Sequence, residues 1–424
     1  MEKVYLDNAA TTRVRENVIS KMQDALSQFY GNPSSTHSFG RSAKTAIESA
    51  RKTIAKNMNA QPSEIIFTSG GTEADNMILR SAVRDLGVKT IITSKIEHHA
   101  VLHTVENLRD EYGIKLEFVG LDEDGNPDLK HLEELLQQDS AAKQDASSEQ
   151  DVSAKEDASL KQDVSARANA SSKQNSSAKQ AAPRTLVSLM HINNEIGNKL
   201  DVEEVCRLCK EYDALFHSDT VQSIGHYPWD VKATPVDFLA AAAHKFHGPK
   251  GIGFAYIRKG SGLKPSILGG SQERGFRAGT ESFHNIVGLE EAFSAAYEHL
   301  EEETAFVAGL KKYFIERVKQ EIPSAKFNGL SDDMERSTFT LVNVCLPIDP
   351  EKAMMLLFHL DIKGIACSEG SACQSGSTSG SHVLNEILSE DNLQKPSLRF
   401  SFSKYNTKEE LDYVVGVLKE FVNE

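Results

Sequence analysis

Lys245 is the residue whose surroundings most directly indicate chemistry. It follows the apolar run 239–243, which is typical of a buried strand, and it is flanked by His244 and His247. A lysine at the end of a buried strand is partly desolvated, and desolvation makes its amine more nucleophilic. Such an amine can form an imine with an aldehyde cofactor. The alternative is a lysine whose stem lies along the strand end while its amine reaches water.

Asp219 follows a second strand-like stretch, residues 215–218. In open α/β sheets, ligands bind at the carboxyl ends of the strands. A carboxylate in that position can keep a pyridine nitrogen protonated, which strengthens an electron sink. Asp219 could instead cap the N-terminus of a following helix.

The segment 69–73, Ser-Gly-Gly-Thr-Glu, lies between a predicted strand and a predicted helix. Its glycines allow close approach of the backbone to a ligand, and exposed N–H groups at a helix N-terminus attract phosphate. The segment therefore predicts a phosphate cradle, with an ordinary turn and a Thr72 helix cap as the alternative.

Cys373 lies in a stretch rich in Gly and Ser, residues 368–377. We expect a mobile, exposed loop there, whose thiolate could attack an electrophile. Cys367, just before this stretch, is expected to be a core residue at a strand end. Cys206 and Cys209 lie in the middle of a predicted helix without a second pair, so they are expected to pack in the core rather than bind zinc.

Strand and helix patterns alternate through the first 300 residues. Strands are predicted at 64–68, 90–94, 115–119, 185–190, 215–218 and 237–241, with helices from residue 72, after residue 98 and over 202–212. This alternation is typical of a mostly parallel sheet with helices on both faces, an α/β fold. Later, long helices at 301–321 and 408–422 flank strands at 339–345 and 397–402, which predicts a smaller α+β domain.

Residues 139–183 differ from the rest, because they contain almost no large apolar side chains and repeat every six residues. The repeat positions are Asp145, Asp151, Asp157, Asp163, Asn169 and Asn175. Six residues advance a helix by a net 240° or so, and no apolar stripe forms on either a helix or a strand. We predict a disordered insertion between a helix at 128–138 and a strand, cut first by proteases and dispensable for activity. A tether for a partner is the alternative.

The predicted domains follow from these patterns. A large domain covers 14–298, interrupted by the insertion 139–183, and a small domain combines 1–13 with 299–424 and carries Cys373. The net charge of −14 over 424 residues argues against nucleic acid or an anionic membrane as the main partner. Without a signal pattern or a long apolar run, and with an odd number of cysteines, five, we expect reduced thiols and a cytoplasmic location.

The motifs, in their order along the chain, resemble those of NifS/IscS-type cysteine desulfurases in the class V aminotransferase family. The resemblance covers nearly the whole chain except the insertion. It rests on the Lys245 segment and on residues 5–12 (YLDNAATT), 31–35 (GNPSS), 68–73 (TSGGTE), 97–101 (EHHAV), 191–197 (HINNEIG), 273–280 (ERGFRAGT), 370–373 (GSAC) and 398–401 (LRFS). It implies a pyridoxal 5'-phosphate (PLP) transferase of fold type I.

The resemblance also implies a role for each matching residue. Lys245 would hold the PLP aldehyde, Cys373 would receive the sulfur as a persulfide, and His98 would stack on the ring and move protons. The other implied roles are Asp219 at the pyridine nitrogen, Gln222 at the ring hydroxyl, Gly71, Thr72 and His244 at the phosphate, Thr280 at the phosphate from a second subunit of a homodimer, and Asn194 and Arg399 at the substrate carboxylate, Asn194 being part of the cofactor site as well.

The implied reaction converts L-cysteine to L-alanine and passes sulfur to an acceptor, such as an iron–sulfur scaffold protein or the tRNA thiolation machinery. Selenocysteine lysis, transamination and a non-catalytic sulfur carrier are the alternatives.

Two departures from the family pattern matter. Ala242 replaces a serine that usually contacts the phosphate, which predicts weaker PLP retention without loss of activity. The chain also ends soon after its last helix, which leaves the identity of the acceptor open, while the length of the Cys373 loop favours the IscS/NifS group over the short-loop SufS group.

Overall fold

The computed structural model describes residues 3–143, 184–369 and 380–423. Most of the predicted insertion and the whole segment 370–379, with Cys373, lie outside these residues. One boundary is wrong: the predicted helix 128–138 runs over residues 129–143, so the first five residues assigned to the insertion are helical. The reason is that Asp139 is buried (7% exposed) and has polar partners in the sheet, which the repeat pattern did not reveal.

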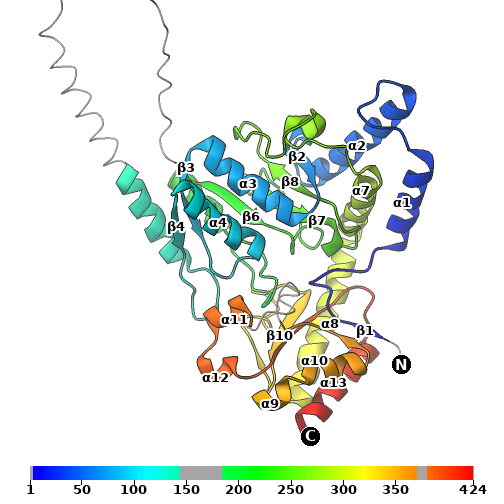
Figure 1. Ribbon diagram of the computed structural model, residues 1–424. Coiled ribbons are helices and arrows are strands. Elements are labelled where there is room, and N and C mark those ends of the chain that lie inside the picture. Colours follow the sequence, from blue (N-terminus) through cyan, green and yellow to red (C-terminus); the bar gives the residue numbers. More distant parts are fainter. Residues whose placement is uncertain (1–2, 144–183, 370–379, 424) are drawn as a thin grey trace, which may run out of the picture.

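A seven-stranded sheet forms the centre of the larger part of the molecule (Figure 1). Five of its strands pair in parallel, and β8 runs antiparallel to both β7 and β2, so six of the seven strands share one direction. In spatial order the strands are β2 (Ile65–Thr68), β8 (Gly253–Ile257), β7 (Phe238–Ala242), β6 (Leu215–Asp219), β5 (Arg184–Ser188), β3 (Val88–Thr93) and β4 (Lys115–Phe118). The prediction of a mostly parallel sheet is confirmed.

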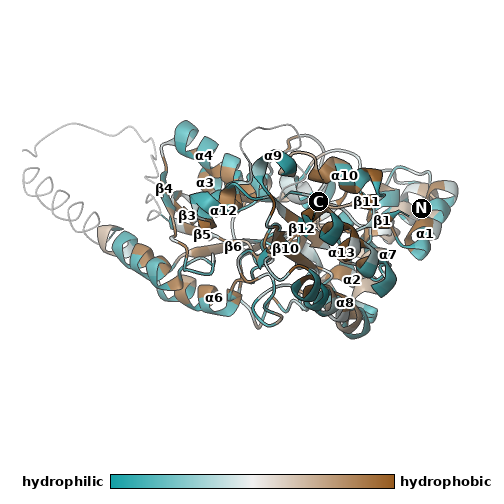
Figure 2. Cartoon of the chain, turned by 90° about the horizontal axis from the view of Figure 1, so that it is seen from below, coloured by the Kyte–Doolittle hydropathy of each residue, from teal (hydrophilic) through white to brown (hydrophobic). Residues whose placement is uncertain are grey.

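Helices cover both faces of this sheet because its strands bury side chains on both sides. Successive residues such as Ile91 and Ile92 belong to different hydrophobic clusters, as the alternation of side chains along a strand requires. One cluster includes α3 (Gly71–Leu86) and α4 (His99–Tyr112). The other includes α1 (Glu16–Gln28), α2 (Ser38–Asn57), α6 (Val202–Glu211), α7 (Phe283–Glu298) and the helix 129–143. Figure 2 shows the polar outer and apolar inner sides of these helices.

Cys206 and Cys209 are both buried in the second of these clusters, on α6. Burial raises the pKa of each thiol above its ordinary value. The prediction that this pair packs in the core is confirmed.

A second region is built around a separate apolar cluster. It joins Val4 and Leu6 to residues between 307 and 421. Its strands are β1 (Val4–Tyr5) paired with β11 (Ile365–Ala366), and β10 (Leu341–Cys345) between β9 (Lys326–Phe327) and β12 (Ser397–Ser401). Its helices are α8 (Leu300–Glu321), α9 (Pro350–Ala353), α10 (Leu356–Ile362), α11 (His382–Ile387), α12 (Glu390–Leu393) and α13 (Lys408–Asn423).

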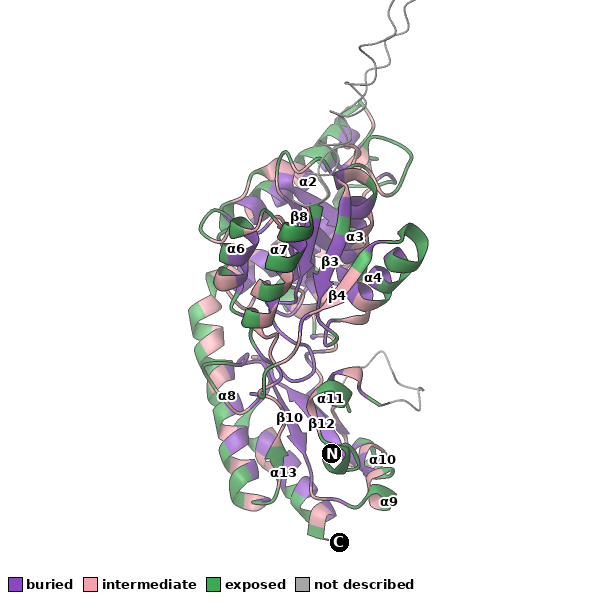
Figure 3. Cartoon of the chain, turned by 90° about the vertical axis from the view of Figure 1, so that its left-hand side faces the viewer, coloured by how far each residue is buried: buried purple, intermediate pink, exposed green. Residues whose placement is uncertain are grey.

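We interpret the two sets of clusters as a large and a small domain. Figure 3 shows the buried strands at the centre of each region with exposed helix faces outside, and both ends of the chain lie in the lower region. Because β1 pairs with β11, the N-terminal segment returns to the small domain before the large domain begins. No helix in the described ranges has the length and apolar character needed to cross a membrane.

Candidate active site

A cavity of about 210 Å³ lies where the carboxyl ends of the large-domain strands face β12. Its lining combines residues from β7, the segments that follow β2, β3, β5 and β6, the N-terminal segment, and β12. The lining residues are Ala9, Ala10, Gly71, Thr72, Asp75, His98, Met190, Asn194, Val221, Gln222, Ala242, His244, Lys245 and Arg399. Nine of the residues singled out from the sequence therefore meet in one place.

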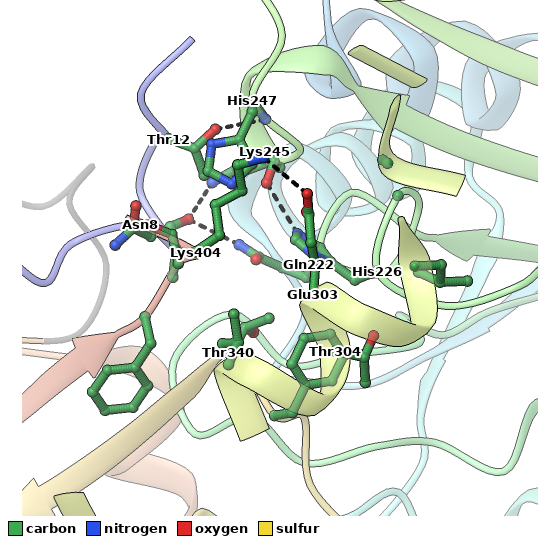
Figure 4. A pocket seen from close by; sticks show the side chains of 18 residues that line it. Asn8, Thr12, Gln222, His226, Lys245, His247, Glu303, Thr304, Thr340 and Lys404 are labelled. Atoms are coloured by element: carbon green, nitrogen blue, oxygen red, sulfur yellow. Dashed lines mark hydrogen bonds and ion pairs between the residues drawn. The ribbon is translucent and has the colours of Figure 1, made fainter. Parts of the chain in front are cut away.

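Lys245 is held at this cavity by the short 3-10 helix Ala243–Lys245, which follows β7 directly. Its Nζ donates hydrogen bonds to the backbone carbonyls of Ala10, at 3.0 Å, and of Ala9. The amine thus lies between the end of a buried strand and the N-terminal segment. Figure 4 shows Lys245 in a neighbouring pocket, where Asn8, Thr12 and Gln222 also contribute to the lining.

The N-terminal segment is itself fixed to the Lys245 turn. The Thr12 hydroxyl donates to the His244 carbonyl at 2.9 Å and accepts from the His247 backbone N–H at 2.8 Å. Glu303, on α8, pairs with Arg15 at 2.6 Å, which ties the segment to the small domain. Glu303 also pairs with Lys404 at 2.9 Å (Figure 4). The position of Lys245 therefore depends on contacts from both regions.

Asp219 is the last residue of β6 and is 5% exposed. Its Oδ1 accepts a hydrogen bond from the Val221 backbone N–H at 2.9 Å. Burial raises the pKa of the Asp219 carboxyl to about 6. The neighbouring Gln222 donates from Nε2 to the Ala9 carbonyl at 3.0 Å.

His98 occupies the N-cap position of α4, and its Nδ1 accepts a hydrogen bond from the Ala100 N–H at 3.1 Å. Burial, with the positive charge of Lys245 as the next cause, lowers the pKa of the His98 imidazole to about 4. The ring is therefore neutral near pH 7, and because Nδ1 is an acceptor, its proton lies on Nε2.

The segment predicted to hold a phosphate lies at the N-terminus of α3, where Gly70 is the N-cap residue and Thr72 lies within the helix. Gly71 begins the helix, and a Cβ atom at Gly71 would lie 2.5 Å from Val221 Cγ2, so a larger residue does not fit there. Thr72 and His244 also line the cavity. Burial first, and then the Lys245 charge, lowers the pKa of the His244 ring to about 4. Ala242 lines the cavity at the end of β7, without a hydroxyl to offer.

Arg399 reaches the cavity from β12 and is 1% exposed. Its Nη1 donates to the Asn194 carbonyl at 2.7 Å and its Nη2 to Asp7 Oδ1 at 3.0 Å. Arg399 Nε and Asn194 Oδ1 are buried and have no hydrogen-bond partner within the described part of the chain. Unsatisfied buried polar atoms at a cavity indicate a polar ligand, and a guanidinium suits a carboxylate.

Thr280 does not line this cavity. It borders a different one, with Gly279, Arg277 and Glu273.

Cys373 lies outside the described residues, so its distance from Lys245 is not defined. Cys367, expected to be a core residue, is half-buried after β11 and packs against the small-domain cluster. No metal-binding group of three or more His, Cys, Asp or Glu side chains occurs among residues 3–143, 184–369 and 380–423.

Asp75 belongs to the cavity and was missed from the sequence. It is 1% exposed, and its Oδ1 lies 3.3 Å from His217 Nε2. Burial, followed by the charge of Asp219, raises the pKa of the Asp75 carboxyl well above its ordinary value. Its spacing of three residues from Thr72, on the same face of a helix, is the signal that could have found it.

The residues at the cavity fit PLP. An amine for an aldehyde and a glycine-lined helix N-terminus for a phosphate converge in one cavity, and Asp219, a buried acid for a pyridine nitrogen, is hydrogen-bonded to the lining residue Val221. The helix begins at the cavity wall beside Val221 because Gly71 has no side chain to collide with it. The unsatisfied Asn194 Oδ1 and Arg399 Nε provide further polar atoms for a bound molecule.

Comparison with known proteins agrees with this geometry. A family model described as aminotransferase class-V matches residues 4–142 and 150–414. A cysteine desulfurase IscS from Dictyoglomus turgidum is 38% identical over 422 residues, which cover 99% of this chain and 94% of the relative. A putative cysteine desulfurase IscS 1 from Bacillus subtilis is 38% identical over 415 residues, with coverages of 97% and 96%.

Two solved structures support the fold. A NifS-like protein superimposes with a TM-score of 0.80 at 33% identity, and each chain is covered completely (100%). SspA in complex with cysteine gives a TM-score of 0.72 at 29% identity, covering 96% of this chain and 100% of that one. The predicted fold type and the predicted cofactor, PLP, are confirmed through this family. The chain belongs to the aminotransferase class-V family, among its NifS/IscS-type cysteine desulfurases, as its motifs predicted.

Proposed function

We propose that this protein is a PLP-dependent cysteine desulfurase that converts L-cysteine to L-alanine and leaves the sulfur as a persulfide on Cys373. The observation that carries the proposal is the single cavity in which Lys245 and His98 of the large domain meet Arg399 of the small domain, with Asp219 buried directly behind its lining residue Val221. An amine, an acid, a neutral imidazole and a guanidinium together meet the requirements of amino-acid chemistry on a pyridine cofactor.

The large-domain residues hold the cofactor and move protons. PLP, when bound, supplies an electron sink for negative charge at the substrate Cα. Lys245 Nζ would hold the aldehyde end and, once freed, would move a proton at the substrate Cα, while Asp219 would pair with the pyridine nitrogen. His98 is neutral and carries its proton on Nε2, so it can exchange a proton with the substrate thiol.

Arg399 and Asn194 orient the substrate. The Arg399 guanidinium and the Asn194 Nδ2 amide would donate hydrogen bonds to the carboxylate of cysteine, and the unsatisfied Asn194 Oδ1 can accept one from a donor of the bound molecule. Cys373 then attacks the substrate sulfur as a thiolate. The S–S bond forms as the C–S bond breaks, so cysteine plus the enzyme thiol gives alanine plus the enzyme persulfide, with all atoms and electrons balanced.

The sulfur leaves by the same exchange. A thiol of an acceptor protein, such as an iron–sulfur scaffold, takes the outer sulfur and returns Cys373 to the thiol form. The location of the protein in the cytoplasm, where thiols stay reduced, is part of this proposal.

The proposal includes a homodimer. Thr280 borders a cavity separate from that of Lys245 in its own chain, which supports its assignment to the phosphate of a second subunit. We expect Thr280→Ala to weaken PLP binding, and mixed dimers of Thr280→Ala with Lys245→Ala chains to have one intact site of two. Light scattering that shows only monomers in the active protein would contradict the dimer.

The test of the function is incubation with L-cysteine, with alanine measured by amino-acid analysis and the persulfide located by mass spectrometry. Cys373→Ser should keep the absorbance of bound PLP and lose alanine formation, whereas the matched control Cys367→Ser should keep both. Alanine production that survives Cys373→Ser would exclude the persulfide route on Cys373 and favour a lyase reaction of the selenocysteine-lyase kind, whereas formation of a keto acid that keeps its sulfur would indicate transamination. Borohydride reduction should trap PLP on a Lys245 peptide, and its absence would favour a non-catalytic carrier.

A further inference from the structure

Asp7 contacts Arg399 directly and has no role in the proposed function. It lies just after β1, and its Oδ1 accepts a hydrogen bond from Arg399 Nη2 at 3.0 Å. The Arg399 side chain is 2% exposed and that of Asp7 is 19% exposed. A guanidinium buried to this extent needs a nearby negative charge, and Asp7 supplies it.

The donors of Arg399 show what this contact does to an incoming carboxylate. Nη1 already donates to the Asn194 carbonyl at 2.7 Å. Nε has no hydrogen-bond partner among the residues that the structure includes, so the edge formed by Nε and Nη2 is the one with an unsatisfied donor. Asp7 occupies half of that edge. A ligand carboxylate that binds there meets a second carboxylate beside the same guanidinium, and like charges at short distance repel.

The backbone holds Asp7 and Arg399 in this relation. The Ser401 N–H donates to the Leu6 carbonyl at 2.7 Å, and the Ala9 N–H donates to Ser401 Oγ at 2.8 Å. These bonds pin the residues on either side of Asp7 to β12, two residues from Arg399. An asparagine at position 7 can therefore keep the same place and still offer an oxygen to Nη2, without the charge.

Glu195 is a second carboxylate near Arg399. Burial raises the pKa of the Glu195 carboxyl, which favours its neutral form, while a hydrogen bond from Ser381 and the positive charge of Arg399 are among the causes that lower it. Glu195 makes no recorded ion pair with Arg399, whereas Asp7 does. The charge that competes at the guanidinium is therefore that of Asp7.

We propose that Asp7 is a positioning residue that sets the affinity of Arg399 for carboxylates by competing with them. The inference rests on the proposed function, because it takes the carboxylate of cysteine as the ligand of Arg399. Substrate and product both carry this group, so the competition weakens the binding of cysteine and alanine alike and favours release of alanine.

The test compares Asp7→Asn with the wild-type holoenzyme. Propionate has a carboxylate and no amine, so it reports on the Arg399 contact without reacting at the cofactor. We expect its dissociation constant, measured by calorimetry, to fall by about tenfold in Asp7→Asn, the change expected from loss of one competing charged contact. The KM for cysteine should fall in the same direction, while the affinity for cysteamine, which lacks a carboxylate, should not increase.

The control is Asp332→Asn, which removes a negative charge from the small domain at its ion pair with Lys319. Propionate affinity that increases equally in both variants, or that stays unchanged or decreases in folded Asp7→Asn protein, would overturn the proposal. Asp7→Ser, also neutral, provides the same comparison if Asp7→Asn does not fold. Because propionate binding requires no turnover, its result is separate from a failure of alanine formation, which would refute the proposed function instead.

Discussion

Two carboxylates are buried at opposite ends of the strands of the central sheet, and they differ in the hydrogen-bond partners that they have. Asp139 lies by the amino ends of β3 and β5 and is 7% exposed, while Asp219 is the last residue of β6, behind the cavity-lining Val221, and is 5% exposed. Asp139 accepts hydrogen bonds from the hydroxyls of Thr90, at 2.7 Å, and Thr185, and pairs with Lys143 at 2.8 Å. The Asp219 carboxylate instead accepts a hydrogen bond from one backbone N–H, that of Val221.

Their acidities differ accordingly. Burial alone would raise the pKa of Asp139, but hydrogen bonds from Lys143, Thr185 and Thr90 outweigh it and lower the pKa below its ordinary value. Burial raises the pKa of Asp219 to about 6. A carboxylate with its own partners stabilises the fold, whereas one without enough partners costs stability and is available to a ligand. We therefore call the amino ends of β3 and β5, where Asp139 lies, the structural end of the sheet. The carboxyl ends of β6 and β7, near Asp219 and Lys245, are its chemical end.

Replacing Lys245 should produce the largest effect at the chemical end. Lys245→Ala is expected to lower the rate of alanine formation by about 10²- to 10⁴-fold, because the group that holds the cofactor and moves the Cα proton is lost. The thermal unfolding midpoint should change little. The assay is alanine release at saturating PLP, with Lys250→Ala, an exposed lysine of the same segment, as the control. A rate near that of the wild type would remove Lys245 from the mechanism.

Asp219→Asn should produce the next largest effect. It should weaken PLP binding but stabilise the cofactor-free protein. The affinity for PLP should fall by about 10²-fold, as expected when one partner of a buried charged contact is removed. The unfolding free energy of the cofactor-free protein should instead rise by about 1–3 kcal/mol at pH 8, because a buried, under-solvated charge is gone. PLP titration and urea denaturation of the cofactor-free protein measure the two quantities.

The pH dependence of this gain has a defined direction. The folded-state pKa of Asp219, about 6, lies above its ordinary value of 3.8, so the wild-type carboxyl binds its proton more tightly in the folded protein. Its favourable contribution is present below pH 4 and is lost as pH rises through about 6. The advantage of Asp219→Asn should therefore grow between pH 4 and pH 7. A constant difference across that range would argue against a raised pKa.

The chemical end of the sheet could largely be predicted from the sequence. Lys245, Asp219 and Thr72 each follow a short apolar run, and parallel strands bring such residues to the same edge. Each residue alone had a structural alternative, such as a helix cap, but their common position after strands indicated a single site.

Contacts made by backbone atoms or by isolated side chains could not be predicted in this way. Ala9 and Ala10 bind Lys245 through their carbonyls, and an alanine gives no sign that its backbone will face a lysine. Asp139 was assigned to the insertion because the residues after it are polar. Its partners Thr90 and Thr185 are 49 and 46 residues away in the sequence, so only the fold reveals them. Asp75 was hidden in the same way within an ordinary helix.

Ala242→Ser tests whether the chemical end has lost a cofactor contact. We expect the dissociation constant for PLP to fall by about 5- to 150-fold, the effect of adding one hydrogen bond to a charged phosphate. Alanine formation at saturating PLP should be little changed. Ala241→Ser is the matched control, because Ala241 packs in the hydrophobic cluster on the other side of β7 and should affect stability rather than PLP affinity. An unchanged dissociation constant in Ala242→Ser would show that no contact is missing.

Asp139→Ala should have the smallest effect, limited to stability. Removing the carboxylate takes away the hydrogen-bond acceptor of the Thr90 and Thr185 hydroxyls and the ion-pair partner of Lys143. This loss should lower the unfolding free energy by about 1–3 kcal/mol at pH 7. Because the folded-state pKa of Asp139 is lowered, its contribution is present above pH 4 and is lost as pH falls further, the reverse of Asp219. Urea denaturation at pH 7 and pH 3.5 measures this, with Glu134→Ala, exposed on the same helix, as the control. A loss of alanine formation in folded Asp139→Ala protein would break the comparison, since it would mean that both ends of the sheet contribute to the chemistry.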